Sequence, residues 1–419
     1  MRGRTAGVAT VAGALVVLAW LVPARAYASP QDLFGYGSRS SAMAATGVAF
    51  GDDYEAVFSN PAGLSRVTRR GLVVGAHGAG YAVSLDGERF TLDAPRATSI
   101  GVELPIPFGG VLEHRIVLGA GFYTPLDVIV RGDIAYPEVP QMPVLTRAKS
   151  VAVQAGIGVD LDGVVDGLRV GAGFSALASL LGDMVTAIDS TGRFGSRVET
   201  QLVATYAPIV GATWEHGDWS FGLVWRGELT AEFEMEVVTR DLPVHLPVLT
   251  IGGLAQYDPH ALAAEAAWRP APGWLFAAQA CWRHWSAYPG AERPTSASSP
   301  APPDPDFSDT ISPRIAVERT IHRGPFDLAL RGGYTWEPSP APPARTDARY
   351  LDNDRHVLTA GVGLAWQPRG EPTRLTLDLY GQLDVLAPRT HDAPAPGHTE
   401  NMRTSGVVAV GGWTVGVHW

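Results

Sequence analysis

Short segments in which apolar and polar residues alternate recur along most of the chain, and this alternation is the feature that most constrains the fold. Residues 374–385 read RLTLDLYGQLDV, which places leucine and valine on one face and mainly polar residues on the other. The same period of two recurs in residues 150–159, 219–232, 326–336 and 356–366. Because successive side chains of a strand point to opposite faces, this period predicts β-strands with one apolar face. A soluble β-sandwich would show the same period, so alternation alone does not place the chain in a membrane.

The connections between the expected strands alternate in length. Short turns follow every second strand, whereas the connections 125–148, 234–259, 290–311 and 339–354 are long. Short turns on one side and long loops on the other, with an even number of strands, are typical of outer-membrane barrels. The sequence therefore predicts an all-β fold, a 14-stranded antiparallel transmembrane β-barrel over residues 71–419. The expected strands cover residues 71–85, 96–107, 114–124, 148–160, 168–180, 198–214, 217–233, 259–269, 273–288, 312–322, 325–338, 355–367, 372–388 and 404–419.

The placement of tryptophans and charges indicates lipid on one face of the strands and a filled lumen on the other. Most tryptophans fall at or near the expected strand ends, where aromatic girdles lie in membrane barrels. The opposite face carries charges that would be costly in the core of a sandwich unless they were paired. These charged residues are Arg169, Arg226, Glu228, Glu265, Arg314, Glu318 and Arg331.

Composition excludes several other classes of protein. An apolar fraction of 46% in 419 residues excludes a disordered chain. The net charge of -10, with Lys149 as the single lysine, argues against a nucleic-acid partner. Cys281 is the single cysteine, so no intramolecular disulfide can form. No enzymatic activity is expected, because no serine nucleophile motif is matched with a histidine. No cofactor is expected, because the glycine pairs are not followed by a helix as nucleotide loops are. No metal site is expected either, although the acidic loop with Asp304, Asp306 and Asp309 leaves calcium open.

Residues 1–28 are predicted to be a cleaved signal peptide. Arg2 and Arg4 precede an apolar run, and two overlapping small-x-small sites end at Ala26 and Ala28. The alternative is an uncleaved membrane anchor, but the apolar run is short for a membrane span. We therefore expect export from the cytoplasm.

The last strand ends in an apolar alternation with a terminal aromatic residue. Trp413, Val415, Val417 and Trp419 share one face. This pattern resembles the C-terminal signature of proteins that the bacterial barrel assembly machinery folds into the outer membrane. We therefore expect that machinery as a partner and the Gram-negative outer membrane as the location. The expected surroundings are outer-membrane lipid and lipopolysaccharide, around a monomeric barrel.

Residues 29–70 show no such alternation and are rich in small residues. Ser59 or Asn60 can cap a short helical turn that has Pro61 in its first position. About forty such residues ahead of the strands predict a partly helical plug inside the barrel lumen, here called the hatch.

The hatch carries a resemblance to a known family. Residues 34–64, FGYGSRSSAMAATGVAFGDDYEAVFSNPAGL, closely resemble the N-terminal hatch of the FadL-type outer-membrane transporters, and residues 273–288 are similar to a W-x-W-S-type strand of that family. Members take up long-chain fatty acids, and relatives take up aromatic hydrocarbons. The resemblance implies passive uptake of a hydrophobic compound through a hatch-gated barrel. The hatch residues assigned to gating are Phe34, Asn60, Pro61 and Ala62.

The resemblance also implies a sideways exit where the third barrel strand is kinked. Gly119, Gly121 and Pro125 would supply the kink, because glycine permits bulges and proline cannot donate to the ladder. The alternative is that these glycines give room for the hatch, and the sequence favours neither reading.

The long connections 125–148 and 234–259 are more apolar than the loops of a sugar or ion porin should be. Exposed apolar patches usually mark a binding site, so these loops are candidates for the first capture of the ligand. The alternative is that they pack on each other and roof the barrel, which capture would not exclude. The capture candidates are Leu126, Ile129, Ile134, Leu246, Leu249 and Ile251.

The chemistry of the ligand stays open. Lys149 falls at a strand end, so a ligand carboxylate would rely on arginines such as Arg226, Arg283 or Arg331. The sequence permits a carboxylate and does not require one. The competing functions are a general diffusion porin or structural barrel, and an outer-membrane lipid hydrolase.

Overall fold

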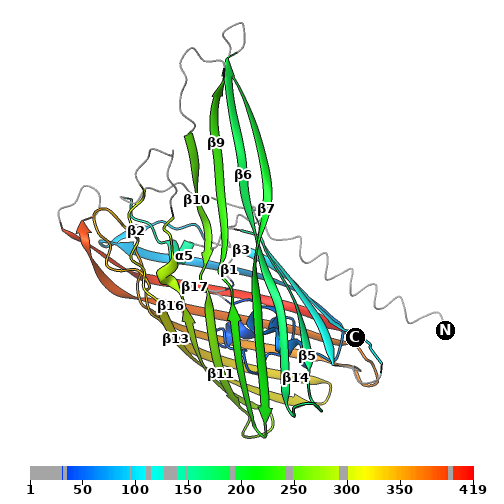
Figure 1. Cartoon of the computed structure of the whole chain (residues 1–419). Coiled ribbons are helices and arrows are strands. Elements are labelled where there is room, and N and C mark those ends of the chain that lie inside the picture. The colour runs from blue at the N-terminus through cyan, green and yellow to red at the C-terminus, as the bar shows by residue number, and fades with distance from the viewer. Residues whose placement is uncertain are drawn as a thin grey trace.

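A closed antiparallel barrel of fourteen strands surrounds the hatch in the computed structural model (Figure 1). Seventeen strand segments make up one sheet. The short β2 only extends the turn after β1. β8 and β9 together form one strand of the barrel, and β10 and β11 together form the next, so the seventeen segments make fourteen barrel strands. The structure describes residue 31 and residues 35–94, 96–109, 115–126, 139–146, 150–188, 194–240, 249–291, 301–394 and 400–419.

The first half of the wall consists of strands β1 to β9. Most of them pair with their neighbours in the sequence, but β9 pairs with β6 and β10. Their bounds are β1 Gly71–Leu85, β2 Glu88–Phe90, β3 Arg96–Pro105, β4 Ile116–Pro125, β5 Ala152–Asp160, β6 Leu168–Ile188, β7 Phe194–His216, β8 Trp219–Arg226 and β9 Leu229–Arg240.

The second half of the wall continues in the same up-and-down order. Its bounds are β10 Leu249–Asp258, β11 Ala261–Trp268, β12 Trp274–Arg283, β13 Thr310–Arg323, β14 Phe326–Glu337, β15 Arg355–Trp366, β16 Arg374–Pro394 and β17 Asn401–His418.

The barrel closes between its first and last strands. β1 pairs with β17 in one uninterrupted antiparallel register from Gly71 opposite His418 to Leu85 opposite Thr404. Arg70 and Trp419 extend this pairing by exchanging backbone hydrogen bonds of 3.1 and 2.9 Å. The terminal strand therefore has a partner on both edges, and no open sheet edge remains at this junction.

The predicted faces of the strands are confirmed. On β16, Leu377, Leu379 and Leu383 are exposed on the outside, whereas Gln382 and Asp384 are buried toward the lumen. Exposed tryptophans lie near the strand ends in the same way. An outward apolar band bordered by aromatic residues is typical of a lipid-facing barrel. Among the described helices, none is long and apolar enough to cross a membrane.

The expected strand at residues 217–233 and the expected loop at 234–259 are corrected by the structure. The strand ends at Arg226, and a second strand, β9, begins at Leu229. Much of the supposed loop is strand, because β9 and β10 pair from Leu229 opposite Asp258 to Val237 opposite Leu249. The backbone of an isolated loop would lack these partners, and the pairing satisfies its polar groups.

The hairpin of β6 and β7 is also longer than the sequence predicts. The two strands pair from Leu168 opposite Trp214 to Ile188 opposite Phe194 and, together with β9, extend beyond the rest of the barrel (Figure 1). β9 pairs with the far half of β6 in parallel, from Leu180 opposite Phe233 onward. This second partner explains why β6 stays extended where the sequence places a loop.

Within residues 35–70, the hatch contributes three short helices inside the ring of strands (Figure 1). They are α3 at Ser38–Ala42, α4 at Ala56–Ser59 and the 3-10 helix η1 at Pro61–Arg66. A further short helix, α5 at Pro143–Thr146, lies in the connection between β4 and β5. The expected partly helical hatch is therefore present, and its helices are too short to be stable without the wall around them.

Candidate functional site

Glycines on the inner face of the wall allow the hatch backbone to approach closely. A Cβ atom on Gly171 of β6 would overlap the backbone nitrogen of Ala62, and one on Gly211 of β7 would overlap the Asn60 side chain. Any larger residue at these wall positions would push the hatch away. The hatch and the wall therefore fit each other at the level of single carbon atoms.

Asn60 connects the hatch to itself and to the wall. Its Oδ1 accepts a hydrogen bond from the backbone N–H of Ala62 at 3.1 Å, so that Asn60, and not the alternative Ser59, caps η1. Its Nδ2 donates to the backbone oxygens of Val48 at 2.8 Å and of Ala212 on β7 at 3.1 Å. The side chain is only 1% exposed, so these bonds are shielded from water. Pro61 and Ala62 follow it inside η1, and a gating role for the three residues stays a prediction.

Asn60→Ala is expected to loosen the hatch, because it removes the cap of η1 and leaves the Ala62 N–H and the Val48 oxygen without a partner. The expected cost in hatch stability is about 1–3 kcal/mol. Hydrogen exchange of the amides of residues 47–66 would measure it. Asn60→Asp keeps the capping acceptor and loses the donors, so it should fall between Asn60→Ala and the parent. Equal exchange in the parent and Asn60→Ala would contradict this role.

A single wall carboxylate holds one whole turn of the hatch. Glu265 of β11 accepts backbone hydrogen bonds from Gly47, Val48 and Ala49 at 2.9, 3.1 and 3.0 Å. It is 4% exposed. Three N–H donors that converge on one carboxylate form a strong charge-assisted site. The strand pattern places Glu265 on the lumen face but does not connect it to the hatch, and the signal for such a contact is a single acid in the alanine-rich strand ALAAEAAW.

Two further wall carboxylates contact the hatch. Glu103 of β3 accepts the backbone N–H of Tyr54 at 2.7 Å. Glu318 of β13 accepts both Nε and Nη2 of Arg39, at 3.0 and 2.9 Å. Together with Glu265, these residues hold the hatch from three separate strands. Removing any one of them would leave buried donors of the hatch unpaired.

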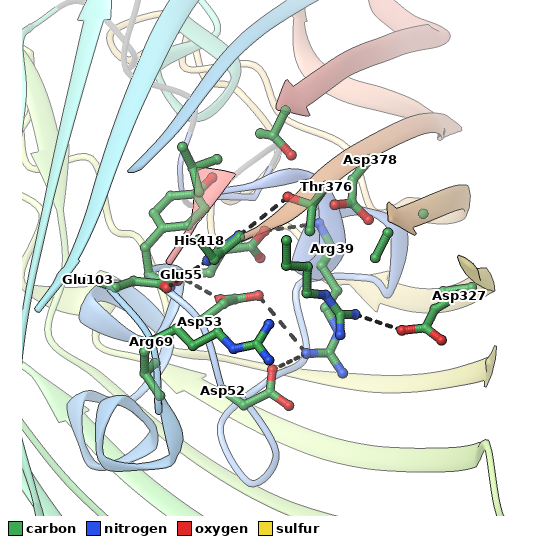
Figure 2. Close-up of a pocket in the computed structure, with 18 of the residues that line it drawn as sticks. Arg39, Asp52, Asp53, Glu55, Arg69, Glu103, Asp327, Thr376, Asp378 and His418 are labelled. Atoms are coloured by element: carbon green, nitrogen blue, oxygen red, sulfur yellow. Dashed lines mark hydrogen bonds and ion pairs between the residues drawn. The ribbon is translucent and has the colours of Figure 1, made fainter. Parts of the chain in front are cut away.

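A polar cavity of about 480 Å³ lies between the hatch and the wall (Figure 2). Its wall residues Asp327, Arg374 and His418 lie at the strand ends next to the short turns. Hatch and wall contribute charges of both signs, and Arg39 ion-pairs there with Asp52 and Glu318. Apolar molecules gain nothing from such a lining, because the polar groups would have to be desolvated. The charged lining residues are Arg39, Asp52, Asp53, Glu55, Arg66, Arg69, Glu103, Glu318, Asp327, Arg331, Arg374 and Asp378.

Burial changes the ionisation of the hatch carboxyl groups in this region. Burial raises the pKa of Glu55 above its ordinary value, although the backbone N–H groups of Ser40 and Arg39 donate to its carboxylate at 2.7 and 3.0 Å. Burial, together with the neighbouring Glu55, raises the pKa of Asp53 well above its ordinary value. These two groups therefore bind protons more readily than exposed carboxyl groups do.

The third barrel strand, β4, contains the residues to which the sideways exit was assigned. Its ladders with β3 and β5 run without a register shift. A Cβ atom on Gly121 would overlap the hydroxyl of Tyr36, and one on Gly119 would lie 2.5 Å from the Leu64 side chain. Pro125 is the last residue of β4 and lies opposite Ala97. The contacts favour the reading in which the glycines give room for the hatch, and an exit at this strand stays a prediction.

The three arginines proposed as partners of a ligand carboxylate lie apart, on β8, β12 and β14. Arg331 pairs with Glu318 at 2.6 Å and with Asp378, and Arg283 pairs with Glu337 at 3.0 Å. The guanidinium of Arg226 lies over the ring of the hatch residue Phe58, 4.8 Å from its centroid. Arg226 is thus the one that borders the apolar part of the lumen, and a role in ligand binding stays a prediction for all three.

Three of the six predicted capture residues lie outside the described parts of the chain. Leu126 is 43% exposed at the end of β4. Leu249 and Ile251 lie on β10, where the structure describes the backbone but not these side chains. Capture therefore stays a prediction. The residues outside the described ranges are Ile129, Ile134, Leu246 and the hatch residue Phe34.

An aromatic cluster at the long-loop end was not foreseen from the sequence. Tyr288 packs against Phe307 with ring centroids 4.7 Å apart and against Tyr257 at 5.3 Å. Trp285 and Tyr350 complete the cluster, and all five side chains are buried. Tyr257 lies on β10, whereas the other four residues lie in the connections β12–β13 and β14–β15. The described part of this end therefore forms a packed roof, and packing of the connections 125–148 and 234–259 on each other stays a prediction.

A serine, a histidine and an aspartate meet near this roof, but their geometry does not support a hydrolase. The hydroxyl of Ser286 lies 3.2 Å from Nδ1 of His284, and Oδ1 of Asp309 lies 3.1 Å from the same nitrogen. A catalytic triad needs the serine and the acid on different nitrogens of the imidazole. Here the two compete for one nitrogen, so the histidine cannot relay a proton between them.

Comparison with known proteins supports the fold. No protein-family model and no curated protein matches the sequence. A FadL homologue from Pseudomonas aeruginosa is 12% identical, with 94% of this chain and 99% of that chain covered and a TM-score of 0.62. The toluene transporter TodX of P. putida is 14% identical, with 93% and 99% covered and a TM-score of 0.56. The toluene transporter TbuX of Ralstonia pickettii is 16% identical, with 91% and 98% covered and a TM-score of 0.51.

Proposed function

We propose that this chain, which has the fold of the FadL-type transporters, is an outer-membrane channel for the passive uptake of hydrophobic compounds. The observation that carries the proposal is the hatch that fills the barrel and is bound to it on several sides. Two proteins of the same fold are described as toluene transporters. We take the substrate class to be aromatic hydrocarbons or long-chain fatty acids.

The hatch argues for a gated channel over a general diffusion porin. A porin needs an open aqueous lumen, whereas wall glycines here contact the hatch backbone directly. Glu265, Glu103 and Glu318 hold the hatch in this position. A small polar solute would therefore have to displace a hydrogen-bonded domain before it could pass.

The two ends of the lumen differ in a way that supports an apolar cargo and a sideways release. Above the hatch the wall carries buried apolar residues, among them Leu177 and Leu229. Toward the short turns lies the charged cavity around Arg39. A hydrophobic molecule is stabilised in the first environment and not in the second, so release into the membrane requires less desolvation than release through the short-turn end.

The remaining parts of the proposal concern location and assembly. Residues 1–28, which lie outside the described ranges, serve as a cleaved signal peptide. The exposed Trp419 ends the strand that the barrel assembly machinery recognises, and the mature protein is a monomer surrounded by outer-membrane lipid and lipopolysaccharide. Mass spectrometry of the purified protein tests the first point, because cleavage leaves an N-terminus after Ala26 or Ala28.

Uptake of labelled toluene and of labelled oleate by a Gram-negative host that lacks its own outer-membrane transporters for these probes tests the function. Cells that express the protein are expected to take up at least one of these probes several-fold faster than cells with an empty vector, because the barrel supplies a path across the lipopolysaccharide layer. Labelled glucose is the matched polar probe and should enter at the control rate. Faster glucose entry with unchanged entry of both apolar probes would favour the diffusion porin.

A further inference from the structure

The barrel wall divides between β7 and the chain that forms β8 and β9. β7 pairs with β8 from His216 opposite Trp219 to Ile209 opposite Arg226. Beyond this point both chains continue as strands, but they no longer pair with each other. β9 pairs instead with β10 and, from Phe233 onward, with β6. We call the unpaired stretch, residues 203–208 of β7 facing residues 227–232, the seam.

Isolated hydrogen bonds replace the backbone ladder at the seam. The N–H of Gly227 donates to the Pro208 oxygen at 2.8 Å, but Pro208 has no N–H with which to return the bond. The N–H of Glu228 turns away to Nδ1 of His260 at 3.0 Å. The hydroxyl of Thr205 donates to the oxygen of Thr230. A strand pair held in this way opens more easily than a continuous ladder.

The inner side of the seam is apolar and meets the hatch. A small cavity of about 40 Å³ lies there, lined by Phe58 of the hatch and by Pro208, Gly227 and Leu229 of the seam. Leu229 belongs to a buried apolar cluster that continues around the inner wall. The other members of this cluster are Ala97, Tyr123, Ala152, Leu177, Ala207, Ala231 and Ala255.

The outer side of the seam is apolar as well. Tyr206 is 66% exposed on the outside of β7 and packs edge-on against Phe174 of β6, with ring centroids 5.8 Å apart. Pro208 is also exposed, and Trp225 lies on the outer face of β8 next to the seam. Apolar surfaces therefore lie on both sides of the seam.

We propose that the hydrophobic cargo leaves the lumen through the seam between β7 and β9. This inference rests on the proposed uptake function and places its exit. At β4, by contrast, both ladders are continuous, and Tyr36 and Leu64 of the hatch fill the space over Gly121 and Gly119. Between β7 and residues 227–232, opening breaks the Thr205 bond and one backbone bond, while Glu232 can stay bonded to Ser179 of β6. Opening at β4 breaks a backbone ladder and displaces Tyr36 and Leu64.

A reversible crosslink tests the seam. A Cβ atom on Gly227 would lie 3.4 Å from the Cβ of Ala207, which is close to the separation in a disulfide, and 2.8 Å from the Cδ of Pro208, whose ring must shift to accept it. The variant Ala207→Cys/Gly227→Cys, built on Cys281→Ala to remove the native thiol, joins the two sides when oxidised. Oxidation is expected to lower toluene or oleate uptake at least fivefold, and reduction should restore it.

The matched control joins the third strand to its neighbour. Phe122 and Val153 lie opposite each other on β4 and β5 and both face outward. Oxidised Phe122→Cys/Val153→Cys should leave uptake within twofold of the parent. Full uptake by the oxidised seam variant, or a block only in the β4 variant, would overturn the proposal. A Cys281→Ala parent that takes up neither probe overturns the uptake function itself, so the two failures are distinguishable.

A second variant covers the case in which the crosslinked barrel does not assemble. Thr205→Val keeps the shape of the side chain and removes the hydroxyl that bonds to Thr230. It should raise the rate of uptake about twofold, because the seam opens more often. Heat-modifiable migration on a gel confirms that the barrel is folded. An unchanged or lower rate in the folded Thr205→Val variant counts against the seam.

Discussion

Deletion of residues 31–66 is expected to turn a barrel without steady conductance into an open pore. These residues fill the lumen from α3 to η1, and inward-facing wall residues that now contact them would line a water-filled passage. Single-channel recording in planar bilayers would show long-lived openings in the deletion variant. The full-length protein should show brief openings or none.

The control for the deletion keeps the hatch but loosens it. Asn60→Ala retains every other hatch residue. Its openings should therefore be more frequent than those of the full-length protein and shorter than those of the deletion variant. A deletion variant that assembles and still does not conduct would mean that the roof around Tyr288 and Phe307 closes the lumen by itself. The hatch would then not be the gate.

The second large effect is expected for Glu265→Ala. The substitution leaves the N–H groups of Gly47, Val48 and Ala49 without their acceptor inside the barrel. Loss of one partner in such a buried, charge-assisted group costs about 3–5 kcal/mol. Hydrogen exchange of these three amides should rise by several hundred-fold, and added protease should cut the hatch of the assembled barrel faster.

Gln279→Ala is the matched control for Glu265→Ala. Gln279 lies opposite Glu265 in the β11–β12 ladder and is also buried toward the lumen. Its truncation removes a polar side chain of similar size without removing the acceptor of the hatch amides. Exchange at residues 47–49 should stay near the parent rate. A similar rise in both variants would show that the hatch responds to lumen packing in general and not to the carboxylate.

The barrel and the hatch could be predicted because their signals are local. Strand alternation, short turns and the cap formed by Asn60 and Pro61 each occupy a few neighbouring residues. The break after Arg226 could not be predicted in this way, because residues 217–233 alternate almost without interruption. It results from the parallel partner that β9 finds in β6, and such long-range pairing leaves no trace in a local pattern.

The contacts that hold the hatch were missed for a related reason. Glu265 binds amides more than two hundred positions earlier in the chain, and Glu318 binds Arg39 at an even larger separation. The sequence showed these residues as charges on the lumen face. It could not show which backbone groups meet them, because that depends on how the strands are arranged around the hatch.

The spread of the hatch contacts has a consequence for how the barrel acquires its size. Glu103 on β3, Glu265 on β11, Glu318 on β13 and Thr359 on β15 all bind hatch residues, and β17 then closes onto β1. A ring with two strands more or fewer would change the distances between these anchors and could not keep all of them. The hatch therefore fixes the number of strands around the barrel, in addition to closing the lumen.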